Sequence, residues 1–291
     1  MNSRRTLTGL VIVASIILVV FLIPTINNPT IKPREARIHY ASYSGWIIET
    51  SNHLLIIDYI ETPPEYSGIS PDTVAHSLEN GYIQSEFIEE KNVLVLTSHA
   101  HTDHYDPIIH EWEDWIEDIQ YYFGWNIGER ENTLSFTGYR DTHREEDFSI
   151  YTVNHPFASE DEPEVAYLIV IDGLTIYHSG DLSVSDPEIR PEFKSNLDYF
   201  AEISNEIDFA FISMARGWYG NFTNGQDIYT IQTLNPKVVY PQHYPNSPIN
   251  YELFAEEAKE KGEEAIFGLA QNRGEAWFYS QGIITKIEYE T

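Results

Sequence analysis

The sequence predicts a mixed α/β (α+β) domain in which two β-sheets are covered by helices, preceded by one N-terminal hydrophobic segment. Two observations predict this fold class: β-rich runs follow one another in the first half of the chain, and helical patterns alternate with short buried strands in the second half. Hydrophobic residues make up 42% and aromatic residues 14% of the 291 residues, as is typical of a folded protein. We expect residues 1–35 to form the N-terminal segment and a linker, and residues 36–291 to form one domain.

An uncharged hydrophobic run extends from Leu7 to Ile23, and Arg4 and Arg5 precede it. As a helix this run would be about 26 Å long, close to the thickness of the hydrocarbon core of a bilayer. A cleaved signal peptide and a buried core helix are alternatives, but no small-x-small cleavage site precedes Pro24, which favours an uncleaved membrane anchor. We expect the domain that follows to lie outside the cytoplasm, and to be secreted if the segment is cleaved.

The charge and the cysteine content exclude several classes of function. There are 46 acidic and 17 basic residues, and the formal net charge of −29 disfavours a nucleic-acid partner because phosphates would be repelled. The chain contains no cysteine, which rules out disulfides, thiolate metal ligands and thiol nucleophiles. Any metal site must therefore use His, Asp or Glu.

The first half of the domain begins with three β-rich runs that predict an antiparallel meander. These runs are residues 37–42, 46–50 and 54–60. Residues 93–97 form a short apolar run that ends just before His99, so the His-rich segment that follows would lie on a loop at the carboxyl end of a strand. Hydrophobic residues at helical spacing between Ile108 and Ile119 predict an amphipathic helix after this loop.

In the second half, Asp172-Gly173 separates two apolar runs and predicts a β-hairpin. The hairpin consists of residues 166–171 and 174–178, and it leads into Gly180-Asp181. The other predicted strands are residues 134–137, 148–154, 209–214 and 238–240 and a terminal group from residue 265, and the predicted helices are residues 191–207, 227–234 and 251–261.

Four side chains that can bind metals occur together in the motif His99-Ala-His101-Thr-Asp103-His104. Two histidines separated by one residue can both point inward from a loop and hold one divalent ion such as zinc. The adjacent Asp103 and His104 provide a second pair of ligands. The motif could therefore serve two ions a few ångströms apart.

This motif resembles the His-x-His-x-Asp-His motif of the metallo-β-lactamase superfamily, and later positions match the family pattern in the same order. His155 follows the strand-like Tyr151-Thr-Val, Asp181 lies in Tyr-His-Ser-Gly-Asp, and His243 ends Val-Val-Tyr-Pro-Gln-His. The resemblance spans residues 37 to 279 and implies a four-layer αββα sandwich. Looser patterns, such as Leu55-Ile-Ile-Asp58, are similar to a branch that includes ascorbate-6-phosphate lactonase and N-acylphosphatidylethanolamine phospholipase D.

The resemblance also implies a dinuclear metal centre. By this likeness, the first ion is held by His99, His101 and His155, the second by Asp103, His104 and His243, and both by the bridging Asp181. The expected cofactors are two divalent ions, in the first place Zn²⁺, with Mn²⁺ or Fe as alternatives. A bridging hydroxide oriented by Asp103 would attack an ester, lactone, amide or phosphodiester of a small or lipid-like substrate.

Several other residues and functions remain open at this point. Arg216, Trp218 and Tyr219 follow a predicted buried strand and could line the substrate site, although loop residues of these types also cover cores. We expect His178 to have a structural role, and His39, His53, His76, His110 and His143 to be ordinary surface residues. The rival functions are an iron-dependent oxidoreductase on the same fold and a non-catalytic, metal-binding membrane sensor or scaffold. The oligomeric state is not indicated.

Overall fold

An eight-stranded sheet is formed by the first half of the domain together with the end of the chain. Its strand order is β15-β14-β1-β2-β3-β4-β5-β6. The predicted antiparallel meander β1-β2-β3 is confirmed, whereas β3, β4, β5 and β6 pair in parallel. The strands are β1 (Glu35–Ser42), β2 (Gly45–Glu49), β3 (His53–Ile57), β4 (Asn92–Thr97), β5 (Ile119–Phe123), β6 (Thr133–Ser135), β14 (Ala276–Ser280) and β15 (Ile283–Ile287).

A seven-stranded sheet with the order β13-β12-β11-β10-β9-β8-β7 faces the first one. Its strands are β7 (Thr142–Arg144), β8 (Phe148–Asn154), β9 (Val165–Ile171), β10 (Leu174–His178), β11 (Ile207–Ser213), β12 (Pro236–Gln242) and β13 (Ile266–Phe267). The predicted hairpin is confirmed, because β9 and β10 pair in antiparallel register around Asp172 and Gly173. Both turn residues have positive φ angles, 50° and 78°, as a two-residue hairpin turn requires.

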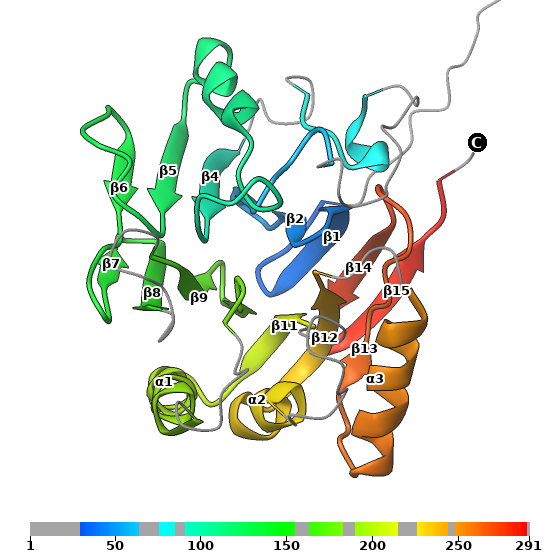
Figure 1. Ribbon diagram of the computed structural model, residues 1–291. Helices are drawn as coiled ribbons and strands as arrows, with labels where there is room; N and C mark the ends of the chain where they lie inside the picture. Colours follow the sequence, from blue (N-terminus) through cyan, green and yellow to red (C-terminus); the bar gives the residue numbers. More distant parts are fainter. Residues whose placement is uncertain are drawn as a thin grey trace, which may run out of the picture. The chain divides into compact units, whose positions relative to one another are not determined.

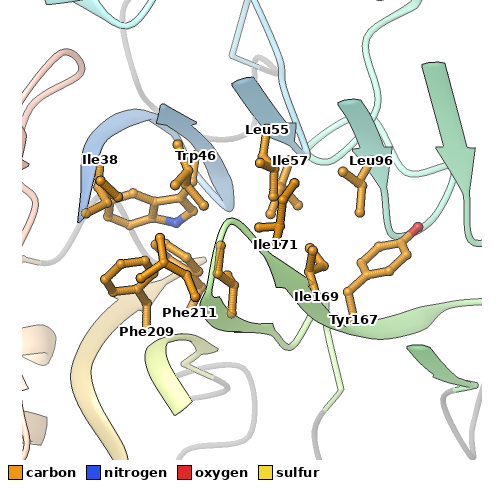
Figure 2. Close-up of a cluster of buried hydrophobic side chains, with 14 of the residues drawn as sticks. Ile38, Trp46, Leu55, Ile57, Leu96, Tyr167, Ile169, Ile171, Phe209 and Phe211 are labelled. Atoms are coloured by element: carbon orange, nitrogen blue, oxygen red, sulfur yellow. The ribbon is translucent and has the colours of Figure 1, made fainter. Parts of the chain in front are cut away.

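The main hydrophobic core lies between the two sheets (Figure 2). The labelled side chains from the first sheet are Ile38, Trp46, Leu55, Ile57 and Leu96, and those from the second are Tyr167, Ile169, Ile171, Phe209 and Phe211. Trp46 joins the sheets, because its ring centroid lies 4.7 Å from that of Phe211 and its Nε1 donates a 3.0 Å hydrogen bond to Gln242. Burial of such aromatic side chains makes the inter-sheet layer the largest source of hydrophobic stabilisation.

Three α-helices cover the outer face of the second sheet (Figure 1). They are α1 (Arg190–Ile203), α2 (Gln226–Leu234) and α3 (Pro248–Glu260). Each helix buries residues three or four positions apart, such as Phe193, Leu197 and Phe200 of α1. The predicted helix 191–207 was too long at its end, because Ile207 already belongs to β11.

The outer face of the first sheet carries the 3-10 helices η2 (Leu78–Asn80) and η4 (Pro107–Asp114) in the part of the chain that is described. The predicted amphipathic helix between Ile108 and Ile119 was therefore wrong in type and in extent. Ile109 and Trp112 of η4 do pack on this sheet, but Ile119 begins β5. The run Ile-Gln-Tyr-Tyr-Phe pairs with β4, so strand pairing overrides the helical spacing. The predicted mixed α/β fold of two sheets is confirmed.

This computed structural model describes residues 30–63, 76–84, 91–154, 163–182, 190–214, 226–243 and 248–289. The chain divides into the units Met1–Thr30 and Ile31–Thr291, and all of the features above belong to the second unit. The hydrophobic segment Leu7–Ile23, the ligand candidate His155 and the substrate candidates Arg216, Trp218 and Tyr219 lie outside the described residues, so these predictions remain untested. Among the residues that are described, no helix is long and apolar enough to cross a membrane.

Candidate metal centre

The side chains of the candidate site come from one end of the two sheets. The His-rich motif follows the carboxyl end of β4, as predicted. Asp181 follows β10, and His243 follows β12, which is parallel to β10 through β11. Because ligands often bind beyond the carboxyl ends of parallel strands, this edge is where a site is expected.

Close backbone contacts hold these segments together. Val165 at the start of β9 donates a 3.2 Å hydrogen bond from its N–H to the carbonyl oxygen of Ser98, directly before the motif. Gly180 has a φ of +51°, and a Cβ at this position would lie 2.7 Å from the Val165 carbonyl oxygen and 2.9 Å from Ser98 Cβ. Only glycine allows this approach at a positive φ. The glycine of Gly180-Asp181 thus fixes the distance between Asp181 and the motif.

Asp103, His104 and His243 form one group of possible ligands, with one donor atom from each lying within 4.8 Å of the others. His243 Nε2 is 3.2 Å from Asp103 Oδ2, and His104 Nε2 is 4.0 Å from the same oxygen. The three side chains belong to two segments that are about 140 residues apart in sequence. The fold therefore brings together the residues predicted for the second ion.

Asp181 lies between this group and the first histidines of the motif. Its Oδ1 is 3.2 Å from His104 Nε2 and 3.3 Å from His243 Nε2, whereas its Oδ2 is 3.8 Å from His99 Nε2. One carboxylate oxygen thus faces each of the two predicted ligand groups.

On the other side of Asp181, His99 and His101 form a group with Glu164, which the sequence analysis missed. His99 Nε2 lies 3.1 Å from His101 Nδ1 and 4.0 Å from Glu164 Oε1. Glu164 directly precedes β9, after Glu160-Asp161-Glu162-Pro163, so its only sequence signal was a position beside a predicted strand. Because three other acidic residues precede it in the sequence, Glu164 did not stand out as a ligand candidate.

Burial and charge set the protonation states that a metal centre needs. Burial and the nearby His104 lower the pKa of His99 to about 3, so its imidazole is neutral and can donate a lone pair at neutral pH. Burial alone would raise the pKa of Asp181, but the His243 and His104 rings hold it well below its usual range. The pKa of Asp103 is also low, because a hydrogen bond from His243 and the charge of His104 outweigh the effect of burial. Both carboxylates are therefore ionised.

Behind the ligands, the buried Asp58 fixes the orientation of His104. Asp58 Oδ2 accepts a 2.7 Å hydrogen bond from His104 Nδ1, and Asp58 also accepts hydrogen bonds from the N–H and the hydroxyl of Ser98 at 2.7 and 2.8 Å. Burial would lower the pKa of His104, but Asp181 and Asp58 raise it well above the usual value. Without a cation the ring is therefore protonated, and because Asp58 holds the proton on Nδ1, a cation at the centre would displace the proton on Nε2. The pattern Leu55-Ile-Ile-Asp58 contained this residue, but its partner was not evident from sequence.

The donor set fits a divalent cation. His104 Nε2 and Asp181 Oδ1 are buried and have no hydrogen-bond partner among the described residues. They face each other at 3.2 Å. Because an unsatisfied buried polar atom costs about 1–3 kcal/mol, converging imidazole and carboxylate atoms of this kind are those expected around a metal ion.

Of the six other histidines, His76 is exposed, as expected, whereas the others are buried or half-buried. As expected, His178 is structural, because it is buried, its Nε2 donates to the Ser44 carbonyl oxygen at 3.0 Å and its Nδ1 accepts from the Gly180 N–H at 3.1 Å. The expectation that His39, His53 and His110 lie on the surface was wrong. His39 and His53 are buried inside the fold, and the His110 side chain is 15% exposed beside Tyr105.

Known proteins share both sequence and fold with this chain. Residues 37–243 match the family described as the beta-lactamase superfamily domain. A metal-dependent hydrolase of the UPF0173 group from Nanoarchaeum equitans is 28% identical over 247 residues, which cover 79% of this chain and 95% of that protein. The ascorbate-6-phosphate lactonase and phospholipase D branch remains a prediction.

Two solved structures illustrate the likeness in fold. A metallo hydrolase from Ignicoccus hospitalis superposes with a TM-score of 0.58 at 16% identity, covering 88% of this chain and 100% of that one. A diiron β-hydroxylase from Streptomyces venezuelae superposes with a TM-score of 0.53 at 13% identity, covering 85% of this chain and 54% of that one. At these identities the likeness shows the fold alone.

Proposed function

The chain belongs to the beta-lactamase superfamily domain family, and on this premise we propose that it is a dinuclear metal-dependent hydrolase. The position of Asp181 carries the proposal. Its two oxygens face different ligand groups, with Oδ2 toward His99 and Oδ1 toward His104 and His243. A carboxylate with candidate ligands on both sides can bridge two ions.

Each residue of the centre would have a distinct role in hydrolysis. Two bound divalent cations would lower the pKa of a water molecule between them and stabilise negative charge that develops on the substrate. Asp103 is ionised and lies beside His243, so it can orient that water and accept its proton. By holding the proton on Nδ1, Asp58 would leave Nε2 as the His104 atom that binds a cation.

The expected cofactors follow from the donor set of imidazoles and carboxylates. Such donors suit Zn²⁺, with Mn²⁺ or Fe as alternatives. We also assign His155 to the first ion, on the family resemblance. The similarity to a diiron hydroxylase concerns the fold alone and does not favour an oxidoreductase over a hydrolase.

The proposed substrate is a small or amphiphilic ester, lactone, amide or phosphodiester. The acidic chain disfavours nucleic acid, and the predicted membrane segment would hold the site, outside the cytoplasm, near lipid-like molecules. We retain Arg216, Trp218 and Tyr219 as candidates for substrate contact, because an arginine could pair with an anionic group.

An Asp181→Ala variant of the full chain tests the dinuclear proposal. We expect the wild-type protein to contain about two metal equivalents by elemental analysis and to hydrolyse a chromogenic phosphodiester or lactone. The variant should lose at least one equivalent and nearly all activity, because it lacks the shared ligand. Asp198→Ala, which removes an exposed carboxylate of α1, should change neither quantity. Full metal content and activity in Asp181→Ala would refute the proposed bridge.

A further inference from the structure

We propose that Glu164 is an additional, direct carboxylate ligand of the cation held by His99 and His101. This inference rests on the proposed dinuclear function and adds a ligand that the sequence motif does not contain. It would give the first ion a second carboxylate besides Asp181.

The first argument is distance. Glu164 Oε1 is 4.0 Å from His99 Nε2, and the donor atoms of Glu164, His99 and His101 all lie within 4.8 Å of one another. Ligands that bind the same ion at about 2.1 Å can be no more than about 4.2 Å apart. A side-chain shift of less than about 1 Å would therefore bring all three atoms into coordination range.

The second argument is the converging charge. Asp181 Oδ2 lies 3.8 Å from the same nitrogen, His99 Nε2, so two carboxylates from different segments approach one imidazole atom. The Glu164 side chain is only 17% exposed and that of Asp181 only 24%. A cation bound at His99 Nε2 would therefore lie within reach of both carboxylates, which are the oxygen ligands that divalent ions accept.

The third argument is the rigid placement of Glu164. The next residue, Val165, is bonded through its N–H to the carbonyl oxygen of Ser98, and Ser98 directly precedes His99. This contact fixes the backbone of Glu164 relative to the motif. Ligands on well-held backbone need little reorganisation when they bind an ion.

An added carboxylate changes the metal preference of the first site. Together with His99, His101 and Asp181, Glu164 would give this ion four protein ligands, two of them carboxylates, so that a bound water would exceed the four ligands of a tetrahedral zinc site. More ligands and a larger share of oxygen favour ions that accept five or six ligands, such as Mn²⁺ or Fe²⁺. We therefore expect Glu164 to strengthen the binding of Mn²⁺ more than that of Zn²⁺.

The test is titration calorimetry of Mn²⁺ and of Zn²⁺ into the metal-free full chain, comparing wild type with Glu164→Gln. Glutamine preserves the size of the side chain but removes its charge. We expect Mn²⁺ binding at one site to weaken by at least about tenfold, with a smaller change for Zn²⁺ and no change at the other site. Glu252→Gln removes an exposed charge from α3 and should leave both isotherms unchanged.

Two further measurements keep the outcome decisive. The metal-free Glu164→Gln protein should melt at the wild-type temperature, and Glu164→Asp should bind Mn²⁺ with intermediate affinity because it keeps the charge but shortens the reach. The assignment would be overturned if Glu164→Gln bound Mn²⁺ as tightly as the wild type. It would also be overturned if the only effect of the substitution were a lower stability of the metal-free protein. A wild-type protein that binds only one ion would refute the dinuclear function, while Glu164 would still be tested by the affinity of that ion. If the wild type binds none, both proposals fail.

Discussion

Replacing Asp58 with asparagine should prevent His104 from binding a cation through Nε2, while the size of the side chain at position 58 is preserved. In the wild type, Asp58 Oδ2 accepts from His104 Nδ1, so His104 Nε2 faces the centre. An asparagine can keep its oxygen on the Ser98 N–H, but its amide group then turns N–H donors toward His104. His104 Nδ1 must become an acceptor, and Nε2 then carries the proton and cannot bind a cation.

The expected magnitude follows from the contacts of Asp58. The loss of an outer partner of a metal-bound histidine typically weakens metal binding 10- to 100-fold, which corresponds to about 1.4–2.7 kcal/mol. Asp58 is fully buried and accepts hydrogen bonds at 2.7, 2.7 and 2.8 Å. Because removal of one partner of a buried ion pair costs about 3–5 kcal/mol, we expect the metal-free variant to be less stable by about 3 kcal/mol.

The assay is calorimetric titration of the metal together with urea unfolding of the metal-free protein. Asp172→Asn is a matched control. Like Asp58, Asp172 forms a hydrogen bond with the Nδ1 of a histidine, here His53 at 3.0 Å, but it lies at the other end of β10 from Asp181. Both aspartates have positive φ angles, 46° and 50°, which asparagine tolerates. The control should lose stability and keep its metal affinity. If Asp58→Asn binds the ions as tightly as the wild type, Asp58 does not orient a ligand.

Three other predictions concern stability. Gly180→Ala places a Cβ 2.7 Å from the Val165 carbonyl oxygen at a φ of +51°, so its free energy of unfolding in urea should fall by about 1–3 kcal/mol. The fall should be smaller in Gly262→Ala, where φ is +86° but no atom lies within 4 Å of the new Cβ, and equal losses in the two variants would contradict the packing argument. Burial, and secondarily Arg37, lower the folded-state pKa of His39 to about 3 from 6.5, so the unfolded chain binds the extra proton and stability is lost as the pH falls below 6.5. Between pH 6.5 and 5.5 this loss should be about 1 kcal/mol greater in the wild type than in His39→Gln, and an equal slope would rule out a buried neutral His39. Zn²⁺ at 100 times its dissociation constant should raise the free energy of unfolding by about 2.7 kcal/mol per site, and a chelator should remove this gain. A melting temperature that does not respond to Zn²⁺ would argue against binding to the folded state.

Local patterns in the sequence were sufficient for most of the fold. The apolar run that became β4 and the turn Asp172-Gly173 needed no distant partner to be recognised. The order of His, Asp and His along the chain was enough to select residues that the fold brings together, such as Asp181 and His243 at 3.3 Å. The strand 119–123 was missed because its pairing with β4, rather than its own spacing, decides its conformation.

Features that depend on contacts between distant segments could not be predicted. Glu164 reaches the site only because β9 starts beside Ser98, and that contact joins residues 67 positions apart. The role of Asp58 depends on its burial beside His104, 46 residues later. His39 and His53 were placed on the surface because a single histidine carries no sequence sign of burial. Long-range packing decides all four cases.

Anomalous diffraction from crystals of the metal-loaded full chain tests the dinuclear centre most directly. We expect two peaks, one beside His99 and one beside Asp103 and His104, each about 2.0–2.2 Å from a different oxygen of Asp181. A single peak, or two peaks that do not share Asp181, would contradict the proposed centre.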